Sequence, residues 1–219
     1  METDMKFPIK KILDTKFMRI YDLEIRDGKH YYNASRREEA ELLLNMSDEE
    51  FKSLVPDAVS CEVVLEQEGR EPMLYMAMEY RYPAGRYLLS PPAGLIDPED
   101  KQLSPNEAIR LTAIRELKEE TGLTFKAGDE IDVISPMLLS TPGMSDENNA
   151  MVRMTIRNAD LNELTQSGCE ATEMFGGYKL LTIEDVRRIL DRGLDDDGIA
   201  FSTYTWIALA DFLRVYGSK

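Results

Sequence analysis

The sequence has little histidine and little cysteine. It contains one histidine, His30, and two cysteines, Cys61 and Cys169. Two cysteines so far apart indicate neither a disulfide framework nor a thiolate metal site, so we expect ordinary buried or half-buried thiols. His30 follows a turn signal at residues 27–28, which places it in a loop rather than in catalysis. Any chemistry must therefore rest on carboxylates, of which there are 41.

Basic residues are also too few to balance the acidic ones, and the net charge is -15. This excess of negative charge argues against binding to a nucleic acid polymer or to an anionic membrane. A small anionic substrate stays compatible with it if bound metal ions reverse the local charge. No hydrophobic run reaches membrane-spanning length, and the N-terminal residues lack a signal-peptide core, so we expect a cytoplasmic protein.

Length and hydrophobic patterning predict an α/β protein in two parts. With 219 residues and 43% hydrophobic content, the chain can bury one domain plus a smaller appendage. We expect a small N-terminal β and helical module over residues 1–57 and a larger domain over residues 58–219. For the larger domain we expect an α/β/α sandwich, in which helices cover both faces of a mixed sheet.

The local patterns place the elements of both parts. Alternation over residues 10–33 predicts a β-meander, and residues 35–55 follow a helical pattern with a fresh start at Ser47. In the larger domain the expected strands are residues 59–66, 73–79, 131–139 and 151–156, and the expected helices are residues 105–121, 183–190 and 203–216. Residues 80–105 are dense in proline and glycine.

The helix at residues 105–121 has the best-marked ends in the chain. Ser104 is a favoured N-cap, Glu107 stands three residues on, and Pro105 occupies the first helical position. Gly122 then provides the C-terminal stop. The predicted boundaries of this helix therefore rest on capping chemistry as well as on periodicity.

Three carboxylates lie on one face of this helix. At about 100° per residue, Glu116, Glu119 and Glu120 project within one narrow arc. Like charges at this spacing repel one another, and a hard divalent cation such as magnesium would remove the repulsion. Taken alone, an acidic helix face is usually just a solvated surface.

The context of these carboxylates resembles the Nudix box, G-x5-E-x7-R-E-U-x-E-E-x-G-U, where U is aliphatic. The second half of the box matches in register at Arg115, Glu116, Leu117, Glu119, Glu120, Gly122 and Leu123, and the turn Pro92-Ala93-Gly94 precedes the helix. The first half departs from the pattern, because twelve residues rather than five separate Gly94 from Glu107. A longer turn and about one extra helical turn account for this, with Glu107 capping the helix away from the metal face.

Two flanking segments resemble the ADP-ribose and ADP-sugar pyrophosphatase branch of that superfamily. Residues 79–83 leading to 92–97 look like the strand and loop that enter the box, and residues 140–147 look like the downstream S-P-G-[ST]-[DN]-E loop. The matches together cover roughly residues 79–147. Ser90 stands where relatives tend to carry an acidic residue.

The resemblance implies a role for several residues. Glu116 and Glu120 would hold magnesium, or manganese in its place, while Glu119 would assist or hold a second ion and the Ala93 carbonyl would complete a coordination sphere. Arg115 would orient the neighbouring carboxylates. The expected substrate contacts are Arg81, which would clamp the diphosphate, together with Arg86, Gly94, Pro142 and Gly143.

Members of this branch often supply a further acid from a late loop, and here that acid is Glu170, Glu173 or neither. Their adenine sites often use aromatic residues of an N-terminal module packed across a dimer. Base stacking and ordinary packing both remain open for Phe17, Tyr21, Tyr31 and Tyr32. Trp206 is expected in the core or in a dimer contact.

The function implied is metal-dependent hydrolysis of a pyrophosphate bond, with ADP-ribose or an ADP-sugar giving AMP and a sugar phosphate. The partner would be a small nucleoside diphosphate derivative, and we expect a homodimer. A Nudix hydrolase for another nucleotide sugar, a dinucleotide or a coenzyme is the nearest alternative. A nucleotide-binding module without catalysis, or a structural protein with an acidic surface helix, are the others.

Overall fold

The structure is a computed structural model that describes residues 8–168 and 173–218. The chain forms two compact units. Unit 1 comprises Met1–Val55 and Leu139–Asn148, and unit 2 comprises Pro56–Leu138 and Asn149–Lys219. Within unit 1 the two segments are joined by polar contacts. The Ala34 N–H donates to the Met144 carbonyl at 2.9 Å, and Arg36 Nε lies 2.7 Å from Glu147 Oε2.

Unit 1 contains a three-stranded antiparallel sheet, which confirms the predicted β-meander. Its order is β1 (Ile9–Asp14), β2 (Arg19–Arg26) and β3 (Lys29–Ser35). Gly28 closes the turn between β2 and β3 with a φ of 66°, a conformation that glycine adopts without strain. Because this turn is so short, β3 already includes His30, whose Nδ1 lies 2.7 Å from Asp22 Oδ1. The prediction of a loop position for His30 was wrong.

The helical prediction for residues 35–55 was largely wrong. The chain forms the 3-10 turns η1 (Glu39–Glu41) and η2 (Leu43–Asn45), then the short helix α1 (Asp48–Lys52). Leu42 separates the turns with φ -59° and ψ 140°, outside the helical region, and is fully buried beside Tyr21 and Leu23. Burial of this leucine takes precedence over local helix propensity. The predicted start at Ser47 is confirmed by a capping box with Glu50.

Unit 2 is built on a mixed seven-stranded sheet, which confirms the α/β prediction. The order is β10-β5-β4-β9-β8, with β6 paired to β5 and β7 paired to β4. Strands β4 and β9 are parallel, whereas β4–β5, β5–β6, β4–β7 and β5–β10 are antiparallel. The strands are β4 (Ala58–Glu66), β5 (Met73–Arg81), β6 (Arg86–Ser90), β7 (Ala93–Leu95), β8 (Glu130–Leu139), β9 (Asn148–Arg157) and β10 (Phe175–Leu181).

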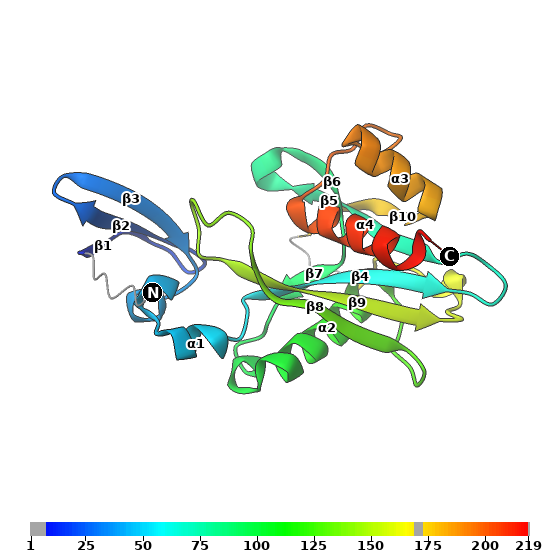
Figure 1. The fold of residues 1–219 in the computed structure, drawn as a ribbon, viewed down its shortest axis with the longest axis horizontal. Coiled ribbons are helices and arrows are strands. Elements are labelled where there is room, and N and C mark those ends of the chain that lie inside the picture. The colour runs from blue at the N-terminus through cyan, green and yellow to red at the C-terminus, as the bar shows by residue number, and fades with distance from the viewer. Residues whose placement is uncertain (1–7, 169–172, 219) are drawn as a thin grey trace. The chain divides into compact units, whose positions relative to one another are not determined.

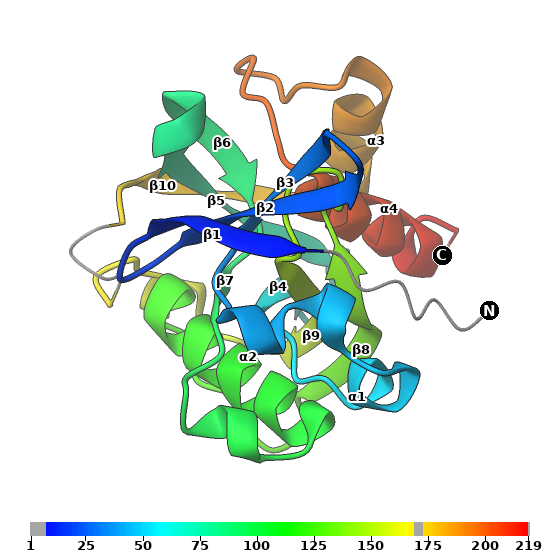
Figure 2. The same ribbon diagram turned by 90° about the vertical axis from the view of Figure 1, so that its left-hand side faces the viewer.

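Helices cover both faces of this sheet (Figures 1 and 2). Helix α2 (Pro105–Thr121) lies on one face, and α3 (Ile183–Arg192) and α4 (Thr203–Tyr216) lie on the other. Strand β5 shows which side chains face each helix layer. Its Tyr75 hydroxyl donates to the Glu120 carbonyl of α2 at 2.9 Å. Its neighbours Leu74 and Met76 belong instead to the core cluster that contains Phe212 of α4. Odd-numbered residues of β5 therefore face α2.

Three strands of unit 2 were missed because proline and glycine obscure them in the sequence. Strands β6 and β7 flank Pro91-Pro92, and β10 contains Gly176-Gly177. Strand β4 pairs with β5 over residues 63–65 but with β7 over residues 58–60. The β6–β7 segment thus crosses from β5 to β4, where the Cys61 N–H donates to the Pro92 carbonyl at 2.7 Å. This crossing places the residues after Pro92 beside β4, the middle strand of the order β10-β5-β4-β9-β8.

Two further expectations concern single side chains. Cys61 is a buried free thiol, as predicted, whereas Cys169 lies outside the described residues. Trp206 of α4 is 53% exposed and so lies outside the core, which leaves a dimer contact as the remaining prediction for it. Within the described chain, no helix is long and apolar enough to cross a membrane.

The face of the sheet toward α4 buries an acidic side chain. Glu62 of β4 is fully buried beside Asp211 of α4. Burial, with the charge of Asp211 second, raises the pKa of Glu62 well above its ordinary value of 4.5, while Arg153 opposes the shift. Arg153 is itself committed to Asp211 and Asp132, at 2.7 Å from each. Glu62 therefore favours its neutral form.

Replacing Glu62 with glutamine should stabilise the fold as the pH rises. A raised folded-state pKa contributes stability that is complete below pH 4.5 and is lost as the pH rises through the folded value. Glutamine stays neutral throughout, so its advantage should grow to about 1–3 kcal/mol near pH 8. Thermal denaturation at about pH 5 and pH 8 measures this difference in stability between the variant and the unmodified protein. Glu184→Gln, at a side chain that is 66% exposed, is the control, and equal effects of the two substitutions would contradict the assignment.

Candidate active site

Helix α2 brings the carboxylates to the sheet. It spans the predicted residues, and its capping box of Ser104 and Glu107 and its left-handed C-cap at Gly122, with φ 75°, are both present. Its buried face carries Glu116 and Glu120, which are only 6% and 4% exposed. Glu119 is half-buried. The acidic face is thus turned toward the protein interior and not into solvent.

Glu116 packs directly on the turn that follows Pro92. A Cβ atom built at Gly94 would overlap the Glu116 carboxylate, so only glycine allows this approach. Arg115 ties the same turn to the helix. Its Nη2 lies 3.0 Å from Glu116 Oε1 and 2.7 Å from the Leu95 carbonyl, and its Nη1 lies 2.8 Å from Asp97 Oδ2. Arg115 therefore holds one oxygen of Glu116 in place.

Glu120 is held from the same turn by a backbone donor. The Ala93 N–H donates to Glu120 Oε1 at 2.9 Å. The contact seen at Ala93 is thus made by its amide group, and the predicted role of its carbonyl as a metal ligand stays a prediction. Together the contacts of Glu116 and Glu120 place both carboxylates beside Ala93 and Gly94.

Both carboxylates are electrostatically unfavourable when ionised. Burial raises the pKa of Glu116 from 4.5 to about 7, with Arg115 opposing and the charges of Glu119, Glu173 and Asp97 adding to the rise. Burial also raises the pKa of Glu120 well above 4.5, against the hydrogen bond from Ala93, and the charges of Glu116, Glu79 and Glu173 contribute. A bound cation would offset both burial and mutual repulsion.

Glu79 belongs to this acidic cluster and received no role from the sequence. It lies on β5, and its side chain is 14% exposed with Oε2 2.7 Å from Arg81 Nη2. Burial raises the pKa of Glu79, the charge of Arg81 lowers it, and the charge of Glu173 raises it. The signal available in advance was strand alternation, which puts Glu79 on the same face as Tyr75. Of the two late-loop candidates, Glu170 lies outside the described residues.

The donor chemistry of this cluster fits a hard divalent cation. Among the described residues, no group of three or more His, Cys, Asp and Glu side chains is arranged to hold a metal ion. Magnesium, however, is commonly bound through only one or two carboxylates, with water and phosphate oxygens supplying the rest. Glu116 and Glu120, two buried carboxylates beside one turn, suit such an ion without forming a closed cage.

The two predicted arginines lie at one end of the β5–β6 hairpin. Arg81 and Arg86 are paired across the strands and both are exposed. The Arg81 side chain is engaged by Glu79, and Arg86 Nε donates to the Ala84 carbonyl at 3.3 Å. The hairpin therefore presents two guanidinium groups next to the strand position of Glu79.

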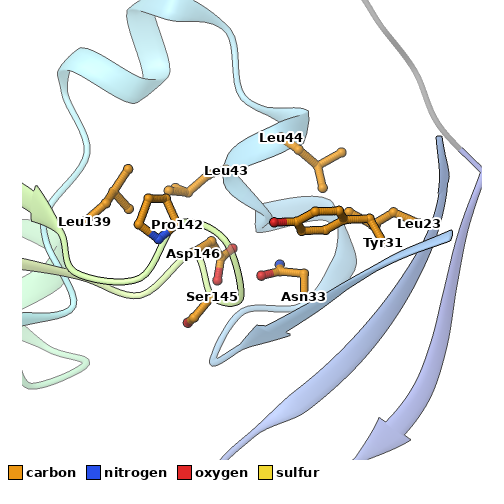
Figure 3. Close-up of a pocket in the computed structure, with 9 residues that line it drawn as sticks. All are labelled: Leu23, Tyr31, Asn33, Leu43, Leu44, Leu139, Pro142, Ser145 and Asp146. Carbon is orange, nitrogen blue, oxygen red and sulfur yellow. The ribbon is translucent and has the colours of Figure 1, made fainter.

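The other two predicted substrate contacts, Pro142 and Gly143, belong to unit 1. The Tyr31 hydroxyl donates to the Gly143 carbonyl at 2.6 Å. Pro142 lines a pocket of about 230 Å³ within unit 1 (Figure 3). The other lining residues are Leu23, Tyr31, Asn33, Leu43, Leu44, Leu139, Ser145 and Asp146. Figure 3 shows Tyr31 and Asn33 directing their polar ends toward the loop that carries Pro142 and Asp146.

Substituting Gly94 should disturb Glu116 without unfolding the protein. The atoms that an alanine Cβ would meet belong to the end of a flexible side chain, so the carboxylate should move and the backbone should not. We expect magnesium affinity, measured calorimetrically, to fall by about tenfold with a small change in melting temperature. In the control, adding Gly94→Ala to Glu116→Gln should lower magnesium affinity little further. If the effects of the two substitutions on affinity were fully additive, Gly94→Ala would not act through the Glu116 carboxylate.

Comparison with known proteins agrees with this geometry. Residues 55–201 match the NUDIX domain model. The chain is 38% identical over 104 residues to ADP-sugar pyrophosphatase of Mus musculus, covering 48% of this chain and 43% of that protein. It is 37% identical over 132 residues to ADP-ribose pyrophosphatase of Mycobacterium tuberculosis, covering 58% and 54%. The matches thus span about half the length of these curated relatives.

A solved structure described as an ADP compounds hydrolase superposes over the full length of both chains with a TM-score of 0.53 and 18% sequence identity, a likeness of fold. The family match covers well over half of the chain and includes β4, the Ala93–Gly94 turn and all of α2. The chain therefore belongs to the Nudix family.

Proposed function

We propose that this protein is a divalent-metal-dependent pyrophosphatase that hydrolyses ADP-ribose or an ADP-sugar to AMP and a sugar phosphate. The observation that carries the proposal is the pair of buried carboxylates, Glu116 and Glu120, held against the Ala93–Gly94 turn. The names of the mouse and mycobacterial relatives support the substrate class. A buried, mutually repelling pair is costly unless a cation is bound, which favours an active centre over a passive acidic surface.

Different residues of the chain have different roles in the proposed reaction. Glu116 and Glu120 would hold the ion, and its charge would lower the pKa values that burial raises in both side chains. When bound, a divalent ion supplies charge neutralisation at the phosphoryl oxygens and makes water more acidic. Arg81 and Arg86 bind the diphosphate oxygens, for which planar guanidinium groups are suited. Water adds across the P–O–P linkage, which breaks to release the two monophosphates.

The general base stays open among the remaining acids of the cluster. Glu119 is half-buried on α2, and Glu173 is exposed just before β10. The charges of both raise the pKa of Glu116, so both lie within electrostatic range of the centre. Three expectations remain predictions: magnesium or manganese as the ion, a homodimer, and a cytoplasmic location. Sedimentation analysis would test the homodimer.

We also propose that the pocket of unit 1 is a site for a nucleobase. Its walls are largely apolar, with Leu23, Leu43 and the Tyr31 ring available to pack on a flat heterocycle. Asn33 offers an amide, and the Asp146 carboxylate lines the same pocket, with its Oδ1 3.7 Å from Arg37 Nη1. A base with an exocyclic amine, such as adenine, could donate to that carboxylate.

Glu120→Gln should abolish turnover of ADP-ribose while the fold stays intact. The amide keeps the shape but removes the charge that binds the cation, so we expect AMP release in magnesium to fall by roughly a hundredfold or more. Chromatographic detection of AMP measures this. Glu107→Gln is the matched control, because that glutamate lies on the same helix but serves only the capping box.

The same assay separates the alternatives. An unchanged rate in Glu120→Gln would refute the metal assignment. Tight binding of ADP-ribose by the unmodified protein with no AMP over hours would favour a nucleotide-binding module. Faster cleavage of a dinucleotide or a coenzyme in a substrate panel would favour another hydrolase of the same family.

Asn33→Ala should weaken binding of AMP. Loss of one hydrogen bond is worth about 1 kcal/mol, so the dissociation constant measured by calorimetry should rise by about fivefold. The control is Asn45→Ala, since Asn45 is an exposed asparagine of the same unit that does not line the pocket. Equal effects of the two substitutions would argue against the pocket as a base site.

A further inference from the structure

The C-terminal end of α2 is buried, and its carbonyl groups are met by other segments of unit 2. The last four carbonyls of a helix have no partner within the helix, and a buried carbonyl needs a donor from elsewhere. The carbonyl of Thr121, a fully buried residue, accepts from the Thr165 N–H at 3.0 Å. The carbonyl of Glu120, which is also buried, accepts from the Tyr75 hydroxyl at 2.9 Å. Donors from two other segments therefore hold the last turn of this helix.

Tyr75 is itself held in a fixed position. It is fully buried on β5, which pairs at this point with Val63 of β4 on one side and Leu180 of β10 on the other. Its ring stacks on the ring of Tyr178, with centroids 5.2 Å apart and an interplanar angle of 23°. A tyrosine side chain has only two torsions, so a fixed backbone and a fixed ring leave its hydroxyl little freedom. The hydroxyl therefore meets the last turn of α2 at a set height above the sheet.

Glu120 is the residue through which this contact reaches the candidate active site. Its backbone carbonyl accepts from Tyr75, and its carboxylate accepts from the Ala93 N–H at 2.9 Å. Tyr75 belongs to β5 and Ala93 to β7, and both strands pair with β4. Because both contacts fall on one residue, a shift of the last helical turn would move the Glu120 carboxylate relative to Ala93. The depth of the helix end thus sets the position of the carboxylate.

We propose that Tyr75 is a positioning residue for the candidate active site, and that its hydroxyl sets the place of the Glu120 carboxylate. This inference rests on the proposed function, since it assumes that Glu120 holds a divalent ion. In this role Tyr75 contacts neither the ion nor the substrate and acts through the backbone of Glu120. Groups that orient a metal-binding side chain affect metal affinity as well as stability, and this separates a positioning role from a purely structural one.

The test is metal binding by the intact protein without substrate, with Tyr75→Phe as the variant. Phenylalanine keeps the ring and its stacking on Tyr178 but withdraws the hydroxyl from the Glu120 carbonyl. We expect manganese affinity, measured by isothermal calorimetry, to fall by about fivefold, the change that corresponds to one hydrogen bond. With ADP-ribose and saturating magnesium, we expect kcat to fall and KM to stay unchanged, because the arginines proposed to bind the diphosphate are not disturbed.

Tyr21→Phe is the matched control. The Tyr21 hydroxyl is also buried and also donates to a backbone carbonyl at 2.9 Å, but its acceptor is Arg37 of unit 1. Both variants should lower the melting temperature by similar amounts, because each removes one buried hydrogen bond. Only Tyr75→Phe should lower manganese affinity. Similar losses of melting temperature with unchanged manganese affinity in both variants would make the role of Tyr75 structural and overturn the inference.

A second replacement at the same position tests the donor itself. Replacing Tyr75 with para-aminophenylalanine keeps an N–H donor at the far end of the ring, and should restore manganese affinity relative to Tyr75→Phe. Affinity that stays low with this donor in place would contradict positioning by a hydrogen bond. Should Tyr75→Phe fail to fold, Tyr178→Leu loosens the Tyr75 ring from a side chain that is 37% exposed, and unaltered manganese affinity there would count against the inference.

Glu120→Gln in the same calorimetry distinguishes this inference from the function on which it rests. Loss of manganese binding in Glu120→Gln with full binding in Tyr75→Phe would refute the role of Tyr75 and leave the proposed function standing. Unchanged binding in both variants would refute both.

Discussion

Burial of like charges at one end of α2 is the constraint on which the rest of unit 2 depends. Glu116 and Glu120 are withdrawn from water, and they meet the Arg115 guanidinium of the same helix and the Ala93 backbone N–H, respectively. Such an arrangement is unfavourable for two ionised carboxylates, and the cation that we propose would offset it. The contact between Gly94 and Glu116 makes the geometry possible, because any larger residue would occupy the place of the carboxylate.

The sheet of unit 2 buries acidic groups on both faces, with different consequences. Glu62, on the α4 side, is enclosed by side chains that are already paired with each other, so it can lower its energy only by keeping a proton. On the α2 side, Glu116 and Glu120 are buried, and Glu79 of β5 is ion-paired with the exposed Arg81. A proton relieves the first arrangement, whereas the cation that we propose would relieve the second.

The errors of sequence interpretation have specific physical causes. The helical pattern after residue 35 was overruled when Leu42 entered the core of unit 1 in an extended conformation. Strands β6 and β7 went unrecognised because Pro91-Pro92 lies between them, although prolines are tolerated there since the segment is passing from one partner strand to another. Of the two places expected for Trp206, the core is excluded because the rotation of α4 leaves its side chain exposed.

The sequence by itself determined α2, from its N-cap at Ser104 to Gly122, and with it the spacing of the three glutamates and the family resemblance. These features depend on contacts within a few turns of one helix, which local periodicity and capping chemistry describe. Only the tertiary structure decided that Glu79 lies on the face of β5 that α2 covers, and that Ala93 and Gly94 meet Glu120 and Glu116. Those relations depend on the register of β4, β5 and β6, and pairing between distant segments is not encoded in any one of them.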